Sequence, residues 1–279
     1  MVITQITLTV EESKRLIAEG IKRHPKVINA LNEGSILFKG GSTVSKVSEV
    51  ITNQRLELCG IITERGTIIN MGIDDSMPHI SLYKNRKIVN IDDSFMESAL
   101  KLTDRDLVIC GANALDNYGN AAMMVGNLSG GDTSHALNTW YGEGVPILIP
   151  VGYEKLVPNN LNDVLKKTGR KKKMYSIGMS VGLIPLIGEI FTEVDAISYI
   201  TGMESYIIGS GGLGVAKGSI TLDVCGEKGQ IKEFFDFIME LKKEEAHSID
   251  NYTQCKPICN FCIEHLGCIY KRCFKEAIL

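Results

Sequence analysis

Five cysteines gather near the C-terminal end of this 279-residue sequence. Their spacing is C-x3-C-x2-C-x5-C-x4-C, and such short gaps let several thiolates meet at one ion or cluster. Iron–sulfur clusters use four thiolates, and zinc sites use four cysteines or a mixture with histidine. We therefore predict an iron–sulfur cluster or a zinc ion, held by four of these five residues: Cys255, Cys259, Cys262, Cys268 and Cys273. Disulfides and unligated thiols are the alternatives.

A glycine-bearing turn follows the apolar run SILFK and has the composition of an anion-binding loop. It consists of Gly40, Gly41, Ser42 and Thr43. Glycines let the backbone approach an anion closely, and the amides and dipole of a following helix favour negative charge. The turn therefore predicts an anion-binding loop, although an ordinary strand-to-helix turn has the same composition. The Walker spacing is absent.

A longer polar loop follows a second apolar run at residues 106–111. Asn113, Asp116 and Asn120 stand just beyond this run, and ligands of parallel sheets bind at the carboxyl ends of the strands. The loop leads into a second glycine segment that we expect to open a helix. That segment adds three residues to the predicted ligand-binding set: Gly130, Gly131 and Thr133. We expect both loops to face one pocket for a negatively charged metabolite.

Together, the two loops resemble the superfamily of ribose-5-phosphate isomerase, glucosamine-6-phosphate deaminase and CoA transferases. They are similar also to the lactate-utilisation domain. The resemblance covers roughly residues 35–155. The matching positions are Gly41, Ser42, Thr43, Gly111, Ala112, Asp116, Gly119 and Asn120, with Gly130 and Gly131 near a third loop of the family.

The resemblance implies a phosphate-holding loop and, in the transferases, a nucleophilic glutamate. Glu64 and Glu154 each follow an apolar run, and with Asp116 they are the candidate catalytic residues. An ordinary role as loop carboxylates is the alternative. Asn113 stands where the isomerases carry an aspartate. Because an amide cannot serve as the base of a sugar isomerisation, the resemblance supports ligand binding more than it supports the isomerase reaction.

One basic cluster and one further glycine motif complete the candidate functional segments. Lys166, Lys167 and residues 170–173 are typical of a solvated helix end and loop, with contact to phosphate, CoA or RNA as the alternative. Residues 209–214 match the G-x-G-x-x-G pattern of dinucleotide-binding loops. A strand-like stretch rather than a helix follows them, so we expect a glycine-rich hairpin or lid.

Apolar runs that alternate with helical periodicity must position these loops. Near-continuous apolar runs indicate strands covered on both faces, and we predict such strands at 35–39, 56–62, 106–111 and 145–152. The predicted fold is therefore α/β, a layered and mostly parallel sheet with helices on both faces. Capping boxes at Thr9–Glu12 and Ser94–Glu97 predict two helix starts, and Gly34 is expected to end a helix in a left-handed turn.

The sequence divides into three parts by its composition and hydrophobic pattern. Residues 1–192 form the predicted α/β ligand-binding domain, 193–250 a small α+β unit and 251–279 a Cys-rich metal-binding tail. Within the small unit we expect strands in three β-rich runs and then one amphipathic helix. In order, these elements are 196–200, 205–209, 219–224 and 231–241.

Composition limits the classes of partner. Hydrophobic residues make up 44% and charged residues 23%, with a net charge of -3, which excludes a disordered or collagen-like chain. Nucleic acid is not an expected partner, because a basic excess is absent. The longest uncharged stretch, residues 174–188, is shorter than the about 20 residues of a membrane span. We therefore expect no membrane partner and interpret the stretch as core or subunit interface, which allows a homo-oligomer.

These observations predict a protein that binds a small anionic metabolite carrying a phosphate, carboxylate or CoA group. Catalysis of the isomerase or transferase type is an open option. The start of the sequence lacks a secretion pattern, so we expect a cytoplasmic protein with reduced cysteines. One alternative is a non-catalytic metabolite or redox sensor with the same fold. Another is an RNA-binding protein with a zinc tail.

Overall fold

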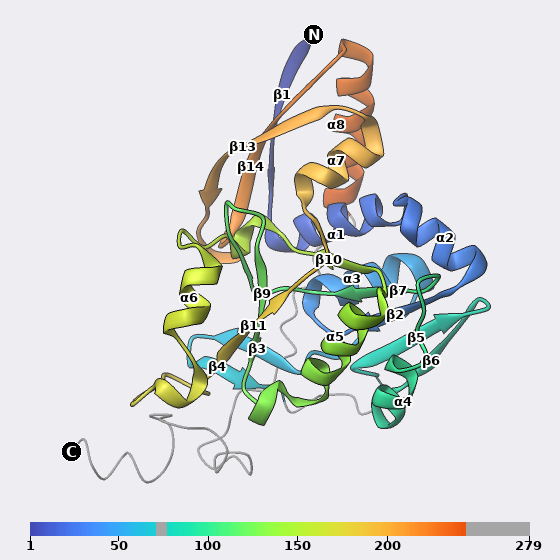
Figure 1. Cartoon of the computed structure of the whole chain (residues 1–279). Coiled ribbons are helices and arrows are strands. Elements are labelled where there is room, and N and C mark those ends of the chain that lie inside the picture. The colour runs from blue at the N-terminus through green and yellow to red at the C-terminus, as the bar shows by residue number, and fades with distance from the viewer. Residues whose placement is uncertain (71–76, 244–279) are drawn as a thin grey trace.

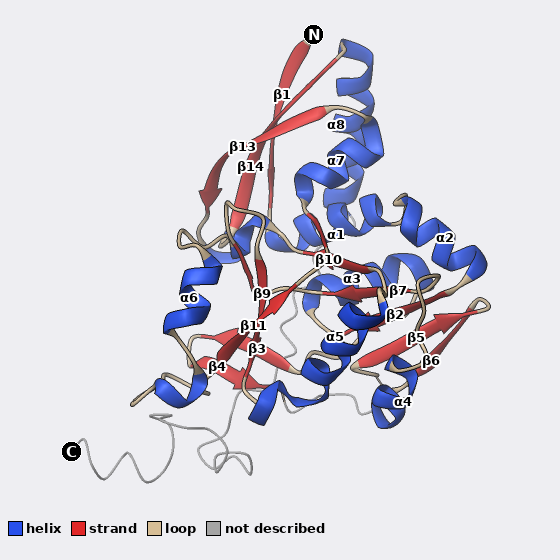
Figure 2. Ribbon diagram, viewed as in Figure 1, coloured by secondary structure: helices blue, strands red, loops and turns tan. Residues whose placement is uncertain are grey.

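The computed structural model of the chain describes residues 1–70 and 77–243 (Figure 1). The predicted tail 251–279, with all five candidate metal ligands, lies outside the described residues, as do residues 244–250 of the small unit. Within the described residues the chain has a mixed α/β fold with one large sheet and three smaller ones (Figure 2).

The large sheet has six strands and a mixed direction. β12, β10, β7 and β2 are parallel to one another, whereas β5 and β6 continue the sheet antiparallel. The predicted strands at 35–39, 106–111 and 145–152 are confirmed, and the parallel arrangement holds for four strands of the six. In spatial order the strands are β12 (Glu189–Phe191), β10 (Ile147–Pro150), β7 (Leu107–Cys110), β2 (Ser35–Lys39), β5 (Ile80–Lys84) and β6 (Lys87–Asn90).

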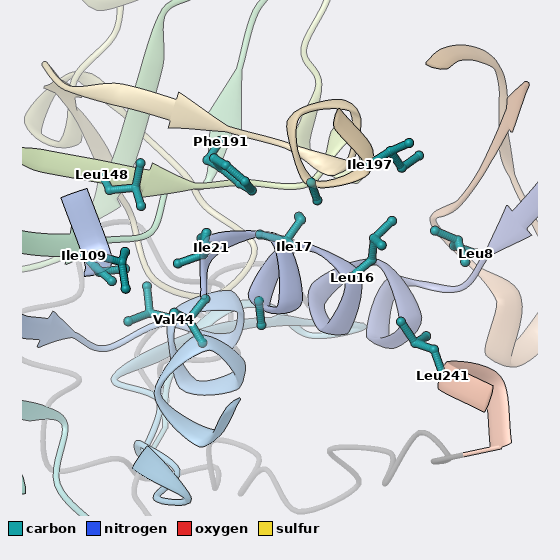
Figure 3. Close-up of a cluster of buried hydrophobic side chains, with 14 of the residues drawn as sticks. Leu8, Leu16, Ile17, Ile21, Val44, Ile109, Leu148, Phe191, Ile197 and Leu241 are labelled. Atoms are coloured by element: carbon teal, nitrogen blue, oxygen red, sulfur yellow. The ribbon is translucent and has the colours of Figure 1, made fainter. Parts of the chain in front are cut away.

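Side chains of the parallel strands alternate between two buried clusters, one on each face of the sheet. Ile36 and Phe38 belong to one cluster and Leu37 to the other, as the two-residue repeat of a strand requires. Figure 3 shows the first cluster, where Ile109 and Leu148 meet side chains of the covering helices. Those helices are α1 (Val10–Ile21), α2 (Pro25–Glu33), α3 (Ser42–Thr52) and α7 (Glu193–Thr201).

The second cluster lies under α4 (Phe95–Ala99) and α5 (Gly131–Glu143). Trp140 is fully buried there, and its indole N–H donates to the carbonyl of Ala99 over 3.2 Å. Helices therefore cover both faces of the sheet. The expected helix start at residues 126–131 is confirmed, because Gly130 is the N-cap of α5.

The predicted helix ends are confirmed in part. Thr9 and Glu12 form the capping box of α1, with Thr9 N–H donating to the Glu12 carboxylate over 2.8 Å. Ser94 makes no such bond, because a short 3-10 turn at Asp92–Ser94 runs directly into α4. Gly34 follows α2 as expected but has φ −131°, so its turn is not left-handed. Its glycine is needed because a Cβ would collide with the carbonyl of Arg105.

A three-stranded antiparallel sheet stands at the top of the molecule in Figure 1. The first strand, β1 (Val2–Leu8), pairs along its whole length with β14 (Ser219–Gly226), which also pairs with β13 (Glu204–Gly211). Helix α8 (Lys228–Lys243) packs on β1 and β14. The N-terminal strand thus belongs to the sheet of the small unit. The motif at 209–214 lies where β13 turns back into β14, which confirms the predicted hairpin.

The strand prediction at 196–200 was wrong, because these residues lie in α7. Thr192 and Asp195 form a capping box, in which the Thr192 N–H donates to the Asp195 carboxylate over 2.8 Å. This cap starts a helix, and Ala196 and Ile197 are then buried against α1 and the large sheet. Local capping and burial therefore outweigh the strand preference of Ile and Tyr.

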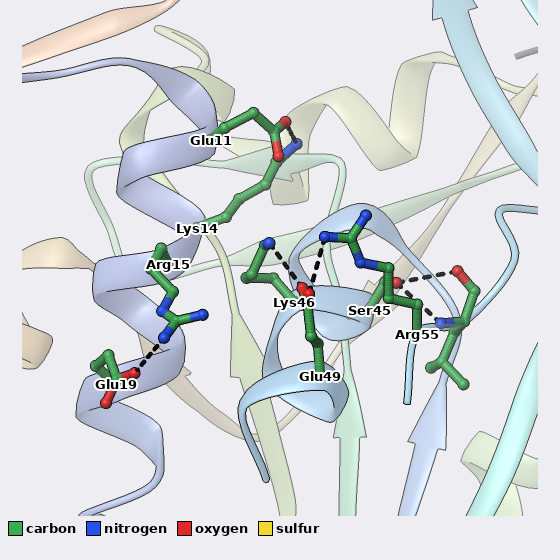
Figure 4. Close-up of polar contacts among 9 residues, drawn as sticks. Glu11, Lys14, Arg15, Glu19, Ser45, Lys46, Glu49 and Arg55 are labelled. Carbon is green, nitrogen blue, oxygen red and sulfur yellow. Dashed lines mark hydrogen bonds and ion pairs between the residues drawn. The ribbon is translucent and has the colours of Figure 1, made fainter. Parts of the chain in front are cut away.

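Only the end of the predicted strand 56–62 is a strand. β3 (Gly60–Thr63) pairs with β4 (Gly66–Ile69) in a hairpin. Leu56 instead has its backbone held by Ser45 of α3, whose hydroxyl accepts from Leu56 N–H at 2.9 Å and donates to its carbonyl at 3.0 Å (Figure 4). A helix side chain thus replaces a neighbouring strand at this position.

The remaining sheet carries the polar loop and the second glycine segment. It consists of β8 (Ala114–Leu115), β9 (Ala121–Val125) and β11 (Gly182–Leu186), all antiparallel, and α6 (Leu161–Lys167) lies beside it. The uncharged stretch 174–188 is core only in its second half: Leu186 of β11 is buried in the second cluster, whereas Met174 is 76% and Ile177 61% exposed. In the described parts of the chain, no helix has the length and apolarity that crossing a membrane requires.

Candidate functional sites

The four parallel strands end along one edge of the large sheet. The residues that follow them are Gly40, Gly111, Val151 and Thr192. This edge is where open α/β sheets bind ligands. Two groups of residues matter for chemistry, one at this edge and one in a cavity beside α5.

The first predicted loop lies at the edge and begins α3. Gly40 N–H donates to the carbonyl of His79 over 3.0 Å, and a Cβ at Gly40 would collide with that oxygen. Gly41 is the N-cap of α3 with open space around its Cβ position, and Ser42 is the first helical residue. Thr43 is buried, and its hydroxyl accepts from the ammonium of Lys155 over 3.4 Å. The loop therefore has a lysine beside it that the sequence analysis did not identify.

Lys155 belongs to a largely buried cluster of charged side chains that follows β10 and β12. Its Nζ lies 3.7 Å from Glu154 Oε1. The carboxylate of Glu193 accepts from Tyr153 N–H over 3.1 Å. A Cβ on Gly152 would collide with Glu154 Oε2 and lie 2.8 Å from Glu193 Oε1, so both carboxylates lie over Gly152. Among the described residues, Oε1 of each glutamate is buried without a hydrogen-bond partner.

Burial shifts the acid–base properties of this cluster. Burial, and after it the nearby Glu154 carboxylate, raise the pKa of Glu193 to about 7. Burial also lowers the pKa of Lys155, against the opposing effect of Glu154. Lys14 of α1 contributes a second positive charge, which lowers the pKa of Lys155 and is itself paired with Glu11 over 2.6 Å. The pKa values of Glu193 and Lys155 are therefore both shifted toward neutral pH.

The second predicted loop holds a turn and a helix start. Buried Asp116 accepts at Oδ1 from the N–H groups of Tyr118 and Asn120, and at Oδ2 from the Leu161 N–H and the Asn120 amide, over 2.8–2.9 Å. Burial raises the pKa of Asp116, but these four bonds outweigh it and the pKa is lowered. Asn113 is exposed, and its amide oxygen accepts from Met124 N–H. The side chains of Asp116 and Asn113 therefore make hydrogen bonds within the protein.

A cavity of about 640 Å³ lies at the N-terminus of α5. Among the predicted ligand-binding residues, all of which are described, Gly130 is the one that lines it. The cavity is therefore not between the two predicted loops. Its lining residues are Val125, Asn127, Leu128, Ser129, Gly130, Ser134, Leu137, Asn138, Tyr141, Gly169, Arg170, Lys171, Lys172, Ile184 and Pro185.

The glycine segment forms one wall of the cavity. Ser129, Gly130 and Gly131 have φ values of 55°, 76° and 62°, a left-handed run that glycine tolerates. A Cβ on Gly130 would collide with the hydroxyl of Ser134. That hydroxyl is buried with no hydrogen-bond partner in the described part of the chain. Because its N-cap is Gly130, α5 has no N-cap side chain, and Thr133 is half-buried in the first turn.

The basic run forms another wall. Arg170, Lys171 and Lys172 make one 3-10 turn after α6, and all three line the cavity. The carbonyl of Arg170 accepts from the Ser180 hydroxyl over 2.8 Å, which ties this turn to the segment before β11. Lys166 and Lys167 lie outside the cavity, exposed at the end of α6.

The candidate catalytic residues are spread over different places. Glu154 belongs to the edge cluster, Asp116 to the turn before β9, and Glu64 is exposed in the turn between β3 and β4. Sequence reasoning missed Lys155 and Glu193. Lys155 follows the apolar run at 145–152, and Glu193 follows the N-cap Thr192, so strand ends and capping boxes were the available signals. No family model matches this chain, and neither curated proteins nor solved structures give a match.

Proposed function

We propose that this protein binds a small anionic metabolite in the cavity at the N-terminus of α5. One observation carries the proposal: three consecutive basic residues, Arg170, Lys171 and Lys172, line the same cavity as the glycine segment that starts α5. The positive end of a helix dipole and basic side chains both favour negative charge. A phosphate, a carboxylate or the phosphates of a CoA-type group would fit this chemistry.

The rest of the lining suggests the remainder of the ligand. Leu137, Ile184 and Val125 give an apolar wall. The hydroxyl of Tyr141 is already used, since it donates to the carbonyl of Pro185 and accepts from Ile187 N–H. The buried Ser134 hydroxyl has no hydrogen-bond partner among the described residues and is a polar group that a ligand could engage. A ligand with one anionic end and one apolar end therefore suits the cavity best.

Charge reversal within the basic run tests the proposal. The double variant Lys171→Glu/Lys172→Glu should weaken binding of inorganic phosphate or CoA by at least about tenfold, because about 1.4 kcal/mol of charge-assisted contact corresponds to that factor. Isothermal titration calorimetry measures it. Lys166→Glu/Lys167→Glu is the matched control, since these lysines lie outside the cavity. An equal loss in both variants would contradict a cavity site and indicate a surface patch of the kind that RNA contacts.

We also propose that the tail cysteines bind an iron–sulfur cluster or zinc. The support is their spacing alone. With such a centre, the protein acts in one of two ways. It is either an enzyme whose tail is stabilised by the metal, or a metabolite or redox sensor whose tail contacts a partner. Loss of the metal that leaves turnover intact would favour the enzyme with a structural tail, whereas altered partner binding without any turnover would favour the sensor.

A further inference from the structure

A second site stands apart from the cavity, at the carboxyl edge of the large sheet. It consists of Lys155, Glu154 and Glu193, with Thr43 at the start of α3 beside them. The side chain of Lys155 is 21% exposed and that of Glu154 11%, whereas Glu193 is fully buried. Part of the Lys155 side chain therefore reaches solvent, whereas the carboxyl group of Glu193 in the same cluster is buried.

The contacts of Lys155 are looser than those of an ordinary structural ion pair. The lysine–carboxylate pairs at Lys14–Glu11 and Lys242–Glu12 measure 2.6 and 2.7 Å. The ammonium of Lys155 lies 3.7 Å from Glu154 Oε1 and 3.4 Å from the Thr43 hydroxyl, longer than a charge-assisted hydrogen bond of about 2.7–2.9 Å. Both glutamates also keep a buried oxygen without a hydrogen bond in the described chain. The ammonium group and the two carboxyl groups can therefore still donate or accept hydrogen bonds to a ligand.

We propose that Lys155 is a nucleophilic amine that forms an imine with a small aldehyde or ketone, and that Glu154 and Glu193 transfer the protons of this reaction. The three groups lie within one cluster at the edge where α/β sheets bind ligands. At Gly41, the N-cap of α3 beside Thr43, nothing lies within 4 Å of the Cβ position, whereas at Gly152 the two carboxylates occupy that position. The ligand class is a small carbonyl compound.

The reaction balances without an oxidant or reductant. The neutral amine attacks the carbonyl carbon, a C–N bond forms, and the carbonyl oxygen takes a proton. The nitrogen then passes a proton to a glutamate carboxylate. A glutamic acid returns a proton to the hydroxyl group, the C–O bond breaks, water leaves and the C=N bond forms. Proton transfer is rate-relevant in both halves, which suits a carboxyl group with a pKa of about 7.

The charges around the amine set its pH dependence. Glu154 from its own segment and Glu193 from α7 favour the protonated form, whereas burial and Lys14 from α1 oppose it. The net effect is a lowered pKa of Lys155, so more free amine is present at neutral pH than on an ordinary lysine. The lowered pKa of a buried lysine is a known route to a reactive amine.

Borohydride trapping tests the proposal on the full-length protein. The probe is propanal, a small aldehyde without a charged group, at pH 6.5, and peptide mass spectrometry reports the rate of labelling at each lysine. Lys155 should be labelled at least about tenfold faster than Lys242, a lysine of comparable 31% side-chain exposure that is tightly paired. Labelling of Lys155 at or below the rate of Lys242 would overturn the proposal.

Variants separate reactivity from structure. At pH 6.5 most Glu193 is protonated, because its pKa is about 7. Glu193→Gln therefore keeps the shape and the charge of the side chain but removes the acidic proton that it can transfer. Labelling of Lys155 should then fall by about 100-fold, within the range of a lost general acid. If that variant does not fold, Glu154→Gln tests the other carboxyl group. This change also removes a charge that favours protonated Lys155, so labelling should fall although more free amine is present. Unchanged labelling in a folded variant would refute the role of the carboxyl groups, and Lys155→Arg must abolish the label.

Discussion

Asp116 and Glu193 are both buried carboxylates, yet their pKa values are shifted in opposite directions. Asp116 accepts four hydrogen bonds, which outweigh its burial and lower its pKa. Glu193 also has hydrogen bonds, among them one from Tyr153 N–H, but its burial and the nearby Glu154 carboxylate outweigh them and raise its pKa to about 7. The balance between burial, a neighbouring like charge and hydrogen bonds therefore decides the direction. Asp116 stabilises the fold as an anion, whereas Glu193 is costly when ionised.

The raised pKa of Glu193 predicts a pH-dependent loss of stability. Below the ordinary value of 4.5 the group is protonated in both states and contributes nothing. Between pH 4.5 and about 7 the unfolded chain releases the proton first, so stability falls as pH rises and then levels off. The loss is about 3 kcal/mol at the plateau.

Urea denaturation of Glu193→Gln measures this effect. The variant should gain stability over the natural sequence by up to about 3 kcal/mol more at pH 8 than at pH 4.5. Glu233→Gln, on the exposed face of α8, should show no such pH-dependent difference. An equal free-energy change for Glu193→Gln at the two pH values would contradict a titrating buried carboxyl group.

At the scale of elements, the hairpin β3–β4 is joined to the segment before β11 by close backbone contact. Thr67 and Gly178 form an isolated bridge, and Thr67 exchanges hydrogen bonds with Met179 through its carbonyl and hydroxyl. Gly178 has φ +76°, and a Cβ there would collide with the carbonyl of Thr67. This glycine is required by both its conformation and its neighbour.

Gly178→Ala should therefore destabilise the protein more than a glycine substitution that strains the backbone alone. Gly119 is the matched control, because it has the same φ of +76° and nothing within 4 Å of its Cβ position. We expect Gly178→Ala to cost about 1–3 kcal/mol more than Gly119→Ala. Thermal or urea unfolding measures both. Equal losses of stability in the two variants would mean that the contact at Thr67 adjusts to a Cβ without destabilising the fold.

Elements were predictable where local signals decide them. Apolar runs located β2, β7 and β10, and the Thr9–Glu12 box located α1. The errors share a physical cause, since each depended on a contact made elsewhere. Residues 196–200 became a helix through the cap at Thr192 and burial against α1, and Leu56 was held by Ser45 rather than by a strand.

At the scale of the whole molecule, the candidate sites are assembled from segments far apart in the chain. The edge cluster combines Lys155 with Glu193 and Thr43, and the cavity combines Gly130 with Arg170. The sequence indicated Gly130 and the basic run separately. It could not show that they share a cavity, because the antiparallel pairing of β9 with β11 brings their segments together.

The Cys-rich tail gives the last prediction at this scale. Full-length protein purified without oxygen should contain a stoichiometric metal, because the short spacings of its five cysteines let four thiolates converge. Metal and sulfide analysis with visible absorption distinguishes the outcomes. Iron with sulfide and a brown colour indicate a cluster, and colourless protein with zinc indicates a zinc site.

Substitution assigns that metal to the tail. Cys262→Ser removes a central thiolate and should lower the metal content at least about tenfold, since a lost ligand leaves an incomplete site. Cys59→Ser is the control, because Cys59 stands in the described part of the chain, where no group of histidine, cysteine or acidic residues could hold a metal ion. Metal-free natural protein, or equal metal loss in both variants, would contradict a tail site. If Cys59→Ser keeps the metal and Cys262→Ser loses it, the metal is bound by the tail thiolates. The anion cavity and Lys155 would then be separate from the metal site.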